Sequence, residues 1–259
     1  MSEFWSIVLV LVLSYLAGAI PFGLLIVWIF NGKDLRGIES GRTGGTHAMR
    51  AAGFIAGLLT AGLDVLKGFS TSWIVAWLAP GLPLLSVAAG LCAILGHNYS
   101  IFLIEEKIGG GIRLRGGAGG APAFGAAMAL WPPAGLFILP LGVLVYVLIG
   151  YASVTTMSVG LIASLVFLVR AIQGVSPWEY ILYGVGALGI VMYALRPNLK
   201  RLREGTERPV GLRAYLQKRQ RKHESHVKMD QQSDNKQERE PGHKAQPSRP
   251  TNRRQENGI

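Results

Sequence analysis

The chain has 259 residues, of which half are hydrophobic and 16% are charged. Ordinary soluble domains carry about 25% charged residues, so this composition argues against a soluble protein and indicates a membrane protein. The formal net charge is +11, but 17 of the 26 Lys and Arg residues lie between Arg196 and the C-terminus, against 8 acidic residues. A basic tail beside apolar segments is typical of the cytoplasmic face of a membrane. We therefore expect membrane lipids as partners and no nucleic acid.

The N-terminal segment from Met1 to Phe30 contains Glu3 but no Lys or Arg before its long apolar run. A signal peptide begins with a basic region, so this segment is predicted to be a retained first span. The single cysteine, Cys92, lies in another apolar run and excludes an intrachain disulfide.

Seven stretches are apolar enough for membrane spans, since a helix needs about 20 apolar residues to cross the hydrocarbon core. Two prolines after Trp131 interrupt the apolar stretch from Gly119 to Gly150, and proline does not continue a straight helix. We therefore divide that stretch in two. The predicted spans are residues 4–30, 52–78, 84–104, 119–131, 134–149, 153–169 and 178–195.

The expected fold is an all-α polytopic membrane protein with seven transmembrane helices. Basic residues gather in the loops at 31–50 and 105–118 and in the tail, whereas the opposite loops have only Arg170 nearby. By the positive-inside rule the N-terminus lies outside and the C-terminus is cytoplasmic. A six-span alternative would place the basic tail outside. Residues 1–208 form the membrane domain, and residues 209–259 are predicted to be a basic, mostly disordered tail.

The first basic loop ends in Ser40-Gly41-Arg42-Thr43-Gly44-Gly45-Thr46-His47-Ala48-Met49-Arg50. Glycines that free backbone N–H groups, hydroxyl donors and a closing arginine at a helix start are what an anion-binding loop requires. Glycine-rich loops alone are weak evidence. A flexible basic loop explains this segment equally well.

The second basic loop follows Gly96-His97 and contains Gly109-Gly110-Gly111 and then Arg113-Leu114-Arg115-Gly116-Gly117-Ala118-Gly119-Gly120. Glycines also let helices pack closely in lipid. Interleaved arginines argue against a packing role here, because hydrocarbon excludes them. We interpret the loop as a second set of backbone donors flanked by guanidinium groups.

Charges within the predicted spans are few. Asp64 and Lys67 are three residues apart, so they lie on one helix face, where pairing offsets the cost of charge at membrane depth. A structural and a functional role for this pair are both open. His97 ends a span and is expected to act as a hydrogen-bonding residue more than as a catalytic base. The sequence shows no cluster with metal-ligand spacing, and we expect no cofactor.

Five segments, taken in order, resemble the acyl-phosphate:glycerol-3-phosphate acyltransferase family of bacterial membranes. They are the first-span segment Ser14 to Gly23, the loop from Ser40 to Arg50, Leu63 to Gly68, Gly96-His97 with Gly116 to Gly119, and Tyr151-Ala152-Ser153 with Asn198 to Glu207. The resemblance covers Ser14 to about Arg208. It implies a multi-pass protein of the bacterial inner membrane that transfers an acyl group from acyl phosphate to the sn-1 hydroxyl of glycerol 3-phosphate.

The resemblance also implies roles for particular residues. Glycerol 3-phosphate would be bound by Ser40, Arg50, Ser153 and Asn198. Acyl phosphate would be held by Gly41, Gly44, Gly45, Thr46, Gly116, Gly117 and Gly119. The catalytic residues are left unknown. The family needs no Ser-His-Asp triad, because acyl phosphate is already activated and positioning and charge stabilisation lower much of the barrier. The family leaves the oligomeric state open, and a monomer is plausible.

Several positions depart from the family pattern. Ala118 stands where the second motif has a lysine and Leu195 where the C-terminal signature has a histidine; Arg42 and His47 replace asparagines and Thr156 replaces a serine. The candidates to supply the missing positive charge are Arg42, His47, Arg113 and Arg115. Two alternatives to an active acyltransferase remain. One is a family member with lost or altered activity that binds an anionic lipid or another phosphorylated acceptor, and the other is a small membrane transporter.

Overall fold

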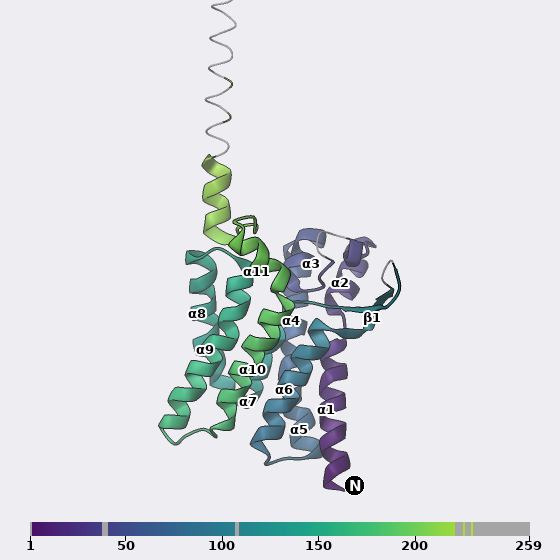
Figure 1. The fold of residues 1–259 in the computed structure, drawn as a ribbon, viewed down its shortest axis with the longest axis vertical. Helices are drawn as coiled ribbons and strands as arrows, with labels where there is room; N and C mark the ends of the chain where they lie inside the picture. Colours follow the sequence, from purple (N-terminus) through teal and green to yellow (C-terminus); the bar gives the residue numbers. More distant parts are fainter. Residues whose placement is uncertain (1, 38–40, 107–108, 221–224, 226–228, 230–259) are drawn as a thin grey trace, which may run out of the picture. The chain divides into compact units, whose positions relative to one another are not determined.

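The structure is a computed structural model that describes residues 2–37, 41–106, 109–220, 225 and 229. It is mostly helical (Figure 1). The α-helices that precede the strands are α1 (Glu3–Ala19), α2 (Phe22–Asn31), α3 (Gly45–Ala52), α4 (Phe54–Phe69), α5 (Thr71–Leu78) and α6 (Pro83–Asn98). Those that follow the strands are α7 (Gly120–Leu130), α8 (Gly135–Leu148), α9 (Ala152–Ile172), α10 (Glu179–Ala194) and α11 (Arg196–Arg203). Short 3₁₀ turns occupy Leu35–Gly37 and Pro132–Ala134.

Three helical segments in the described part of the chain are long and apolar enough to cross a membrane: Glu3–Asn31, Phe54–Leu78 and Ala152–Ile172. A fourth arises if α10 and α11, which are bent by 71° relative to each other, count as one span. The remaining predicted spans coincide with the shorter apolar helices α6, α7 and α8. The bounds of the predicted spans and their total of seven stay predictions.

The first predicted span is interrupted between Ala19 and Phe22. Pro21 has no N–H to continue the helical hydrogen bonds, so the carbonyl groups before it need other donors. The Ser100 hydroxyl donates to the carbonyl oxygen of Ala19 at 2.5 Å, and Lys67 Nζ donates to that of Ile20 at 3.0 Å. The break thus receives donors from two other segments.

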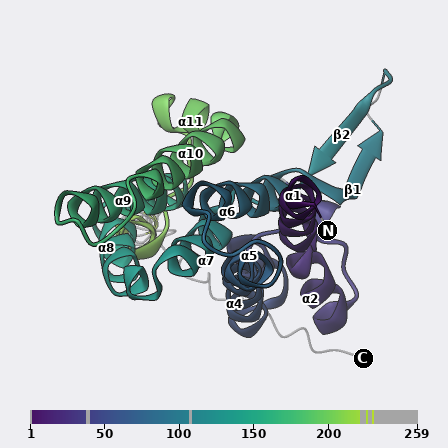
Figure 2. The ribbon, with the colours of Figure 1, turned by 90° about the horizontal axis from the view of Figure 1, so that it is seen from below.

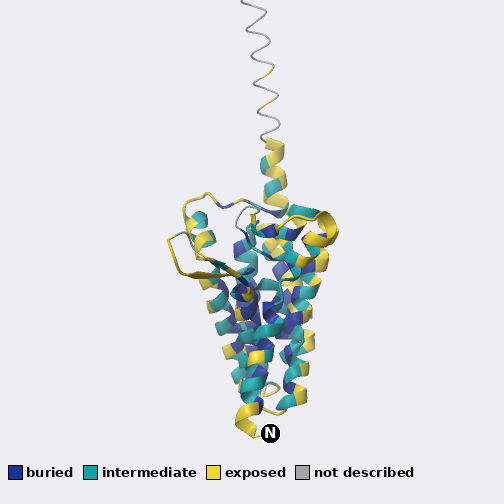
Figure 3. Ribbon diagram, turned by 90° about the vertical axis from the view of Figure 1, so that its right-hand side faces the viewer, coloured by how far each residue is buried: buried dark blue, intermediate teal, exposed yellow. Residues whose placement is uncertain are grey.

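Close helix packing depends on small residues. Gly68 of α4 lies against the backbone of Pro122 in α7, and Gly125 of α7 lies against the backbone of Val65 in α4. A side chain at either position would collide with a carbonyl group, so the two helices approach at their backbones. Buried positions gather along the inner side of the bundle (Figure 3). The largest core cluster contains buried residues from each of the helices α6, α7, α8, α9 and α10, and Phe167 and Tyr183 are its largest side chains.

The all-α prediction is wrong at one place. Residues Ser100–Glu106 form strand β1, which pairs antiparallel with β2 (Ile112–Arg115). The predicted third span, 84–104, therefore ends early, because α6 stops at Asn98. Figure 2 shows this hairpin projecting outward beside α1.

The chain divides into a compact unit, residues 1–214, and a second unit that begins at Tyr215. The predicted disordered tail, 209–259, is helical over residues 211–220. Most of the tail beyond Gln220 lies outside the described residues.

Candidate functional site

A cavity of about 660 Å³ opens at the end of the bundle that carries α3 and α11. Helices α3, α7 and α9 all begin at its wall, with Gly45, Gly120 and Ala152 lining it. Within the described ranges, none of these three helices has a side-chain cap at its N-terminus. Uncapped first-turn N–H groups and the helix dipole favour anions. The cavity is therefore suited to phosphate groups.

The first glycine-rich loop supplies one wall. Gly44, Gly45, Thr46, His47 and Arg50 all line the cavity. Ser40 lies outside the described residues. Gly41 does not line the cavity; it has a left-handed backbone, with φ of +66°, and a side chain there would collide with the Arg115 guanidinium.

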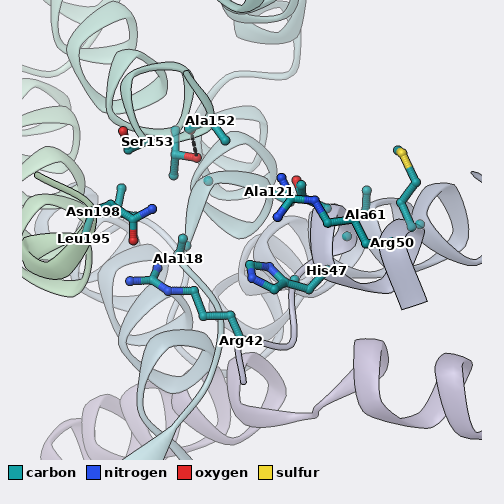
Figure 4. A pocket seen from close by; sticks show the side chains of 18 of the residues that line it. Arg42, His47, Arg50, Ala61, Ala118, Ala121, Ala152, Ser153, Leu195 and Asn198 are labelled. Carbon is teal, nitrogen blue, oxygen red and sulfur yellow. Dashed lines mark hydrogen bonds between the residues drawn. The ribbon is translucent and has the colours of Figure 1, made fainter. Parts of the chain in front are cut away.

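Arg42 crosses the cavity from that loop toward the end of α10. Its Nη2 donates to the carbonyl oxygen of Ala194 at 2.7 Å, next to Leu195. Its Nη1 is buried and has no hydrogen-bond partner within the described ranges. Burial lowers the pKa of the Arg42 guanidinium, and the charge of Arg201 lowers that pKa further. Figure 4 shows the guanidinium beside Ala118 and facing Asn198.

A carboxylate organises the opposite wall. The Ser153 hydroxyl donates to Glu207 Oε2 at 2.7 Å, and Asn198 Nδ2 donates to Glu207 Oε1 at 3.1 Å. Glu207 is 8% exposed. All three residues line the cavity, together with Thr156 and Leu195. Arg50 comes from α3, and in Figure 4 its side chain points inward toward the middle of the cavity that Ser153 and Asn198 also line.

The second glycine-rich loop contributes Ala118, Gly119 and Gly120 to the lining. Gly116 and Gly117 lie behind the lining, packed against His97: a side chain at Gly116 would collide with the His97 carbonyl oxygen, and one at Gly117 with its imidazole. Gly117 N–H donates to that carbonyl oxygen at 2.9 Å. His97 therefore supports this loop from behind.

Asp64, Lys67 and His97 form a buried polar cluster below the cavity. Lys67 Nζ lies 3.0 Å from Asp64 Oδ1, and His97 Nδ1 lies 3.6 Å from the same oxygen. Asp64 and His97 line the cavity floor. Because the other ring nitrogen of His97 faces Gly117, the imidazole is enclosed between Asp64 and the loop. That His97 acts as a hydrogen-bonding residue more than as a catalytic base stays a prediction.

Two of the four candidate replacement cations lie away from the cavity lining. Arg115 pairs with Glu105 of the hairpin and donates to the carbonyl oxygen of Arg36 at 3.2 Å. Arg113 lies opposite Glu105 in the strand register and is exposed. Arg42 and His47 are the candidates that line the cavity.

Sequence reasoning missed two polar residues at the site. Glu207 lies in the C-terminal motif, but the motif predicts no role for it. Asn98 is 4% exposed, and its side-chain amide, which has no hydrogen-bond partner among the described residues, lies against Gly119 at the start of α7. Its position directly after Gly96-His97 was the available signal. In the part of the chain that the structure describes, no group of three His, Cys, Asp or Glu residues could hold a metal ion.

The fold and the site define an integral membrane protein with a cavity suited to anions at one end of its helical bundle. Residues 8–205 match the family model described as glycerol-3-phosphate acyltransferase. The chain is 38% identical over 210 residues to a glycerol-3-phosphate acyltransferase of Thermus thermophilus. The matched region covers 78% of this chain and 94% of that relative. It is 36% identical over 206 residues to glycerol-3-phosphate acyltransferase 2 of Moorella thermoacetica, covering 80% and 98%.

The solved structure of PlsY, an integral membrane glycerol 3-phosphate acyltransferase, in its glycerol 3-phosphate form is similar to this fold. It superposes with a TM-score of 0.66 at 28% identity, covering 82% of this chain and 98% of that chain. The lysophosphatidic acid form gives a TM-score of 0.65 at 27% identity. This chain belongs to the glycerol-3-phosphate acyltransferase family.

Proposed function

We propose that the protein transfers an acyl group to glycerol 3-phosphate and so produces lysophosphatidic acid for phospholipid synthesis. The observation that carries this proposal is the convergence of three helix N-termini and several cationic side chains on one cavity. Both substrates of such a reaction carry a phosphate if the donor is an acyl phosphate. A cavity whose walls offer anion sites on more than one side fits a pair of phosphorylated substrates.

The reaction needs no protein nucleophile. The sn-1 hydroxyl oxygen of glycerol 3-phosphate attacks the carbonyl carbon of acyl phosphate, and a new ester bond forms. The bond between that carbon and the phosphate oxygen breaks, so inorganic phosphate leaves, and the hydroxyl proton passes to a phosphate oxygen. The protein then contributes by positioning the two substrates and by stabilising negative charge on the leaving phosphate.

The acceptor and the donor are assigned to different residues. Arg50, Ser153 and Asn198 bind glycerol 3-phosphate, and Ser40 joins them from outside the described residues. Glu207 sets the orientation of Ser153 and Asn198 by accepting from both. The N-termini of α3 and α7, with Gly45, Thr46 and Gly119, hold the phosphate of the donor.

Arg42 supplies the positive charge that the second loop lacks at Ala118. One end of its guanidinium is fixed on the Ala194 carbonyl, and the Nη1 atom has no partner among the described residues. A fixed guanidinium loses little further freedom on binding an anion. It lies beside Ala118 and next to Leu195, the two positions where the family pattern has a lysine and a histidine (Figure 4). One arginine thus offers charge where two family side chains are absent.

The proposal extends to location. We infer a bacterial inner membrane protein with seven crossings and with its cavity on the cytoplasmic side, because the basic loops surround the cavity. Glycerol 3-phosphate is soluble and reaches that side from the cytoplasm. The acyl donor carries a long chain and reaches the cavity from the membrane.

The test is phosphate release by purified protein in lipid mesophase, with palmitoyl phosphate as donor and glycerol 3-phosphate as acceptor. We expect release that depends on glycerol 3-phosphate and that falls at least about a hundredfold in Arg42→Ala and Arg50→Ala, which is a typical loss for removing one charge-stabilising donor. Arg203→Ala is the matched control, because Arg203 is exposed and does not line the cavity.

The departures from the family pattern give the experiment a second outcome. Folded protein that binds glycerol 3-phosphate without releasing phosphate would indicate a family member with altered chemistry. Retained activity in Arg42→Ala together with loss in a His47→Ala variant would assign the replacement charge to His47 instead.

A further inference from the structure

The β1–β2 hairpin presents an apolar face that the described part of the chain leaves partly exposed. Ile104 lies opposite Leu114 in the strand register, and Ile112 lies opposite Glu106. Opposite residues of an antiparallel pair share one face of the sheet, so these three apolar side chains share a face. They are 50%, 37% and 68% exposed in the order Ile104, Leu114, Ile112. We define Ile104, Ile112 and Leu114 as the hairpin face.

The other face of the hairpin is charged. Glu105 and Arg113 are opposite each other in the register, and Arg115 pairs with Glu105. The sheet is therefore amphipathic, with one apolar side and one charged side. Among the described residues of the hairpin, Glu106 is the carboxylate that lies on the apolar side. An amphipathic element of this kind suits a boundary between hydrocarbon and water.

The hairpin leaves the bundle at the depth of a membrane boundary. Ser100 donates to the carbonyl of Ala19 at the end of α1, and Tyr15 donates to the carbonyl of Tyr99 at 2.7 Å. Helix α1 has 17 residues, which corresponds to about 26 Å at 1.5 Å per residue. The hydrocarbon core is about 30 Å thick. The base of the hairpin is thus close to one edge of that layer when the start of α1 is at the other.

Exposed tryptophans mark that other edge. Trp5 near the start of α1, Trp77 near the end of α5 and Trp178 just before α10 are 60%, 83% and 60% exposed. These helix ends lie together at the lower end of the bundle in Figure 1. Tryptophan is enriched at membrane interfaces. The hairpin therefore lies near the interface opposite to this belt.

The hairpin also has the right direction. It runs sideways from the bundle in Figure 1, and in Figure 2, viewed along the bundle, it extends outward past α1. Its strands thus run across the helices that cross the membrane, in the plane where lipid headgroups lie. We propose that the hairpin face rests on the lipid bilayer as an interfacial anchor, with Arg113 and Arg115 on the side of the headgroups and water.

This contact continues the lipid-facing surface of the helices onto an extended element. Strand β2 ends at Arg115 and leads through Gly116 and Gly117 to Ala118 at the cavity wall. The anchor therefore holds one end of the segment that reaches the cavity. The proposal concerns lipid contact alone and does not depend on acyl transfer.

The test uses single cysteines in a Cys92→Ser background, labelled with a small fluorophore, in nanodiscs that each contain one copy of the full chain. Ile112→Cys and Arg113→Cys form a matched pair, because these adjacent residues are on opposite faces of β2. Ile104→Cys is a second reporter of the apolar face, in case one label disturbs the strand. Each labelled protein must elute and unfold as the parent does.

Lipids brominated near the headgroup are expected to quench the labels at Ile112 and Ile104 at least twofold more than the label at Arg113. Aqueous iodide should show the opposite order. Equal iodide quenching at Ile112 and Arg113 would overturn the proposal. A comparison with nanodiscs that contain two copies gives a second outcome that would overturn it. If the labels at Ile112 and Ile104 are protected from both quenchers only in those discs, a second chain covers the face and not lipid.

Discussion

Lys67 Nζ and Asp64 Oδ1 lie 3.0 Å apart on adjacent turns of α4, with 3% and 2% of their side chains exposed. Lys67 also donates to the carbonyl oxygen of Ile20 at the break between α1 and α2. His97 of α6 faces the same carboxylate. The sequence left open whether Asp64 and Lys67 have a structural or a functional role. In the structure this pair connects α4 with α6 and with the break between α1 and α2.

Replacing Lys67 by Met should destabilise the protein strongly. It leaves the Asp64 carboxylate buried without its nearest cation, and breaking a buried pair costs about 3–5 kcal/mol. The double variant Asp64→Leu with Lys67→Met should recover part of this loss, because neither charge remains. Thermal unfolding in one detergent measures both. The single variant Asp64→Leu is measured as well. If the double variant loses as much stability as the two single variants added together, the charge pair is not the source of the loss.

Glu207→Gln should impair use of glycerol 3-phosphate more than use of the acyl donor. The carboxylate accepts from both Ser153 and Asn198, and a hydrogen bond to a charged group contributes about 1.5–3 kcal/mol. We expect the KM for glycerol 3-phosphate to rise by about tenfold to a hundredfold, with the KM for palmitoyl phosphate little changed.

The same residue permits a coupling test. Ser153→Ala combined with Glu207→Gln should cost less than the two single changes added together, because both remove the same hydrogen bond. Additive effects on KM would show that the two side chains act independently.

Gly68→Ala and Gly62→Ala, both in α4, should differ in sign. Gly68 faces the Pro122 carbonyl of α7 at a distance that leaves no space for a Cβ, whereas Gly62 has nothing within 4 Å of that position. The first change forces two helices apart and should cost about 1–3 kcal/mol. The second improves helix propensity by up to about 1 kcal/mol. Melting temperatures of the two variants in the same detergent check this, and a similar fall in both would argue against the close approach of α4 and α7.

Arg42→Lys should retain activity at neutral pH and lose it as the pH rises. Burial lowers the pKa of the native guanidinium, but arginine starts above about 12, whereas lysine starts near about 10.4. If Arg42 holds phosphate as proposed, activity is present below the pKa of the side chain at this position and is lost above it. The alkaline limb of kcat/KM should therefore fall at a lower pH in Arg42→Lys than in the wild type, after spontaneous hydrolysis of the donor is subtracted. Coincident alkaline limbs would exclude Arg42 as the cation.

The apolar helices were predictable from sequence because each lies in an apolar run bounded by glycine, proline or charge. The short polar helices α3 and α11 were not predicted, because neither is an apolar run. The hairpin was not predicted either, since Ile101 to Ile104 continue the apolar run of α6 and apolarity alone does not distinguish a strand from a helix. What separates them in the fold is the pairing of Ile104 with Leu114. That is a contact between segments and is not a property of either segment.

The candidate site shows the same limit. Gly45, Thr46, Arg50, Ser153 and Asn198 were predicted from motifs, and the structure brings them to one cavity. The four candidates for the replacement charge were equal at the level of sequence. Arg42 is distinguished by its place in the cavity lining and by its hydrogen bond to a carbonyl 152 residues later in the chain. Such distant contacts leave no local pattern to detect.

The dependence of Ser153 and Asn198 on Glu207 has a consequence for synthesis of the chain. A nascent protein that ends before residue 207 already contains the first loop, the second loop and both of these side chains, but it lacks the carboxylate that orients them. The part of the cavity wall formed by Ser153, Asn198 and Glu207 is therefore completed only when almost the whole compact unit, residues 1–214, has been made. A product that ends before residue 207 would lack both of these hydrogen bonds, so we expect acyl transfer only after the segment that carries Glu207 has been added.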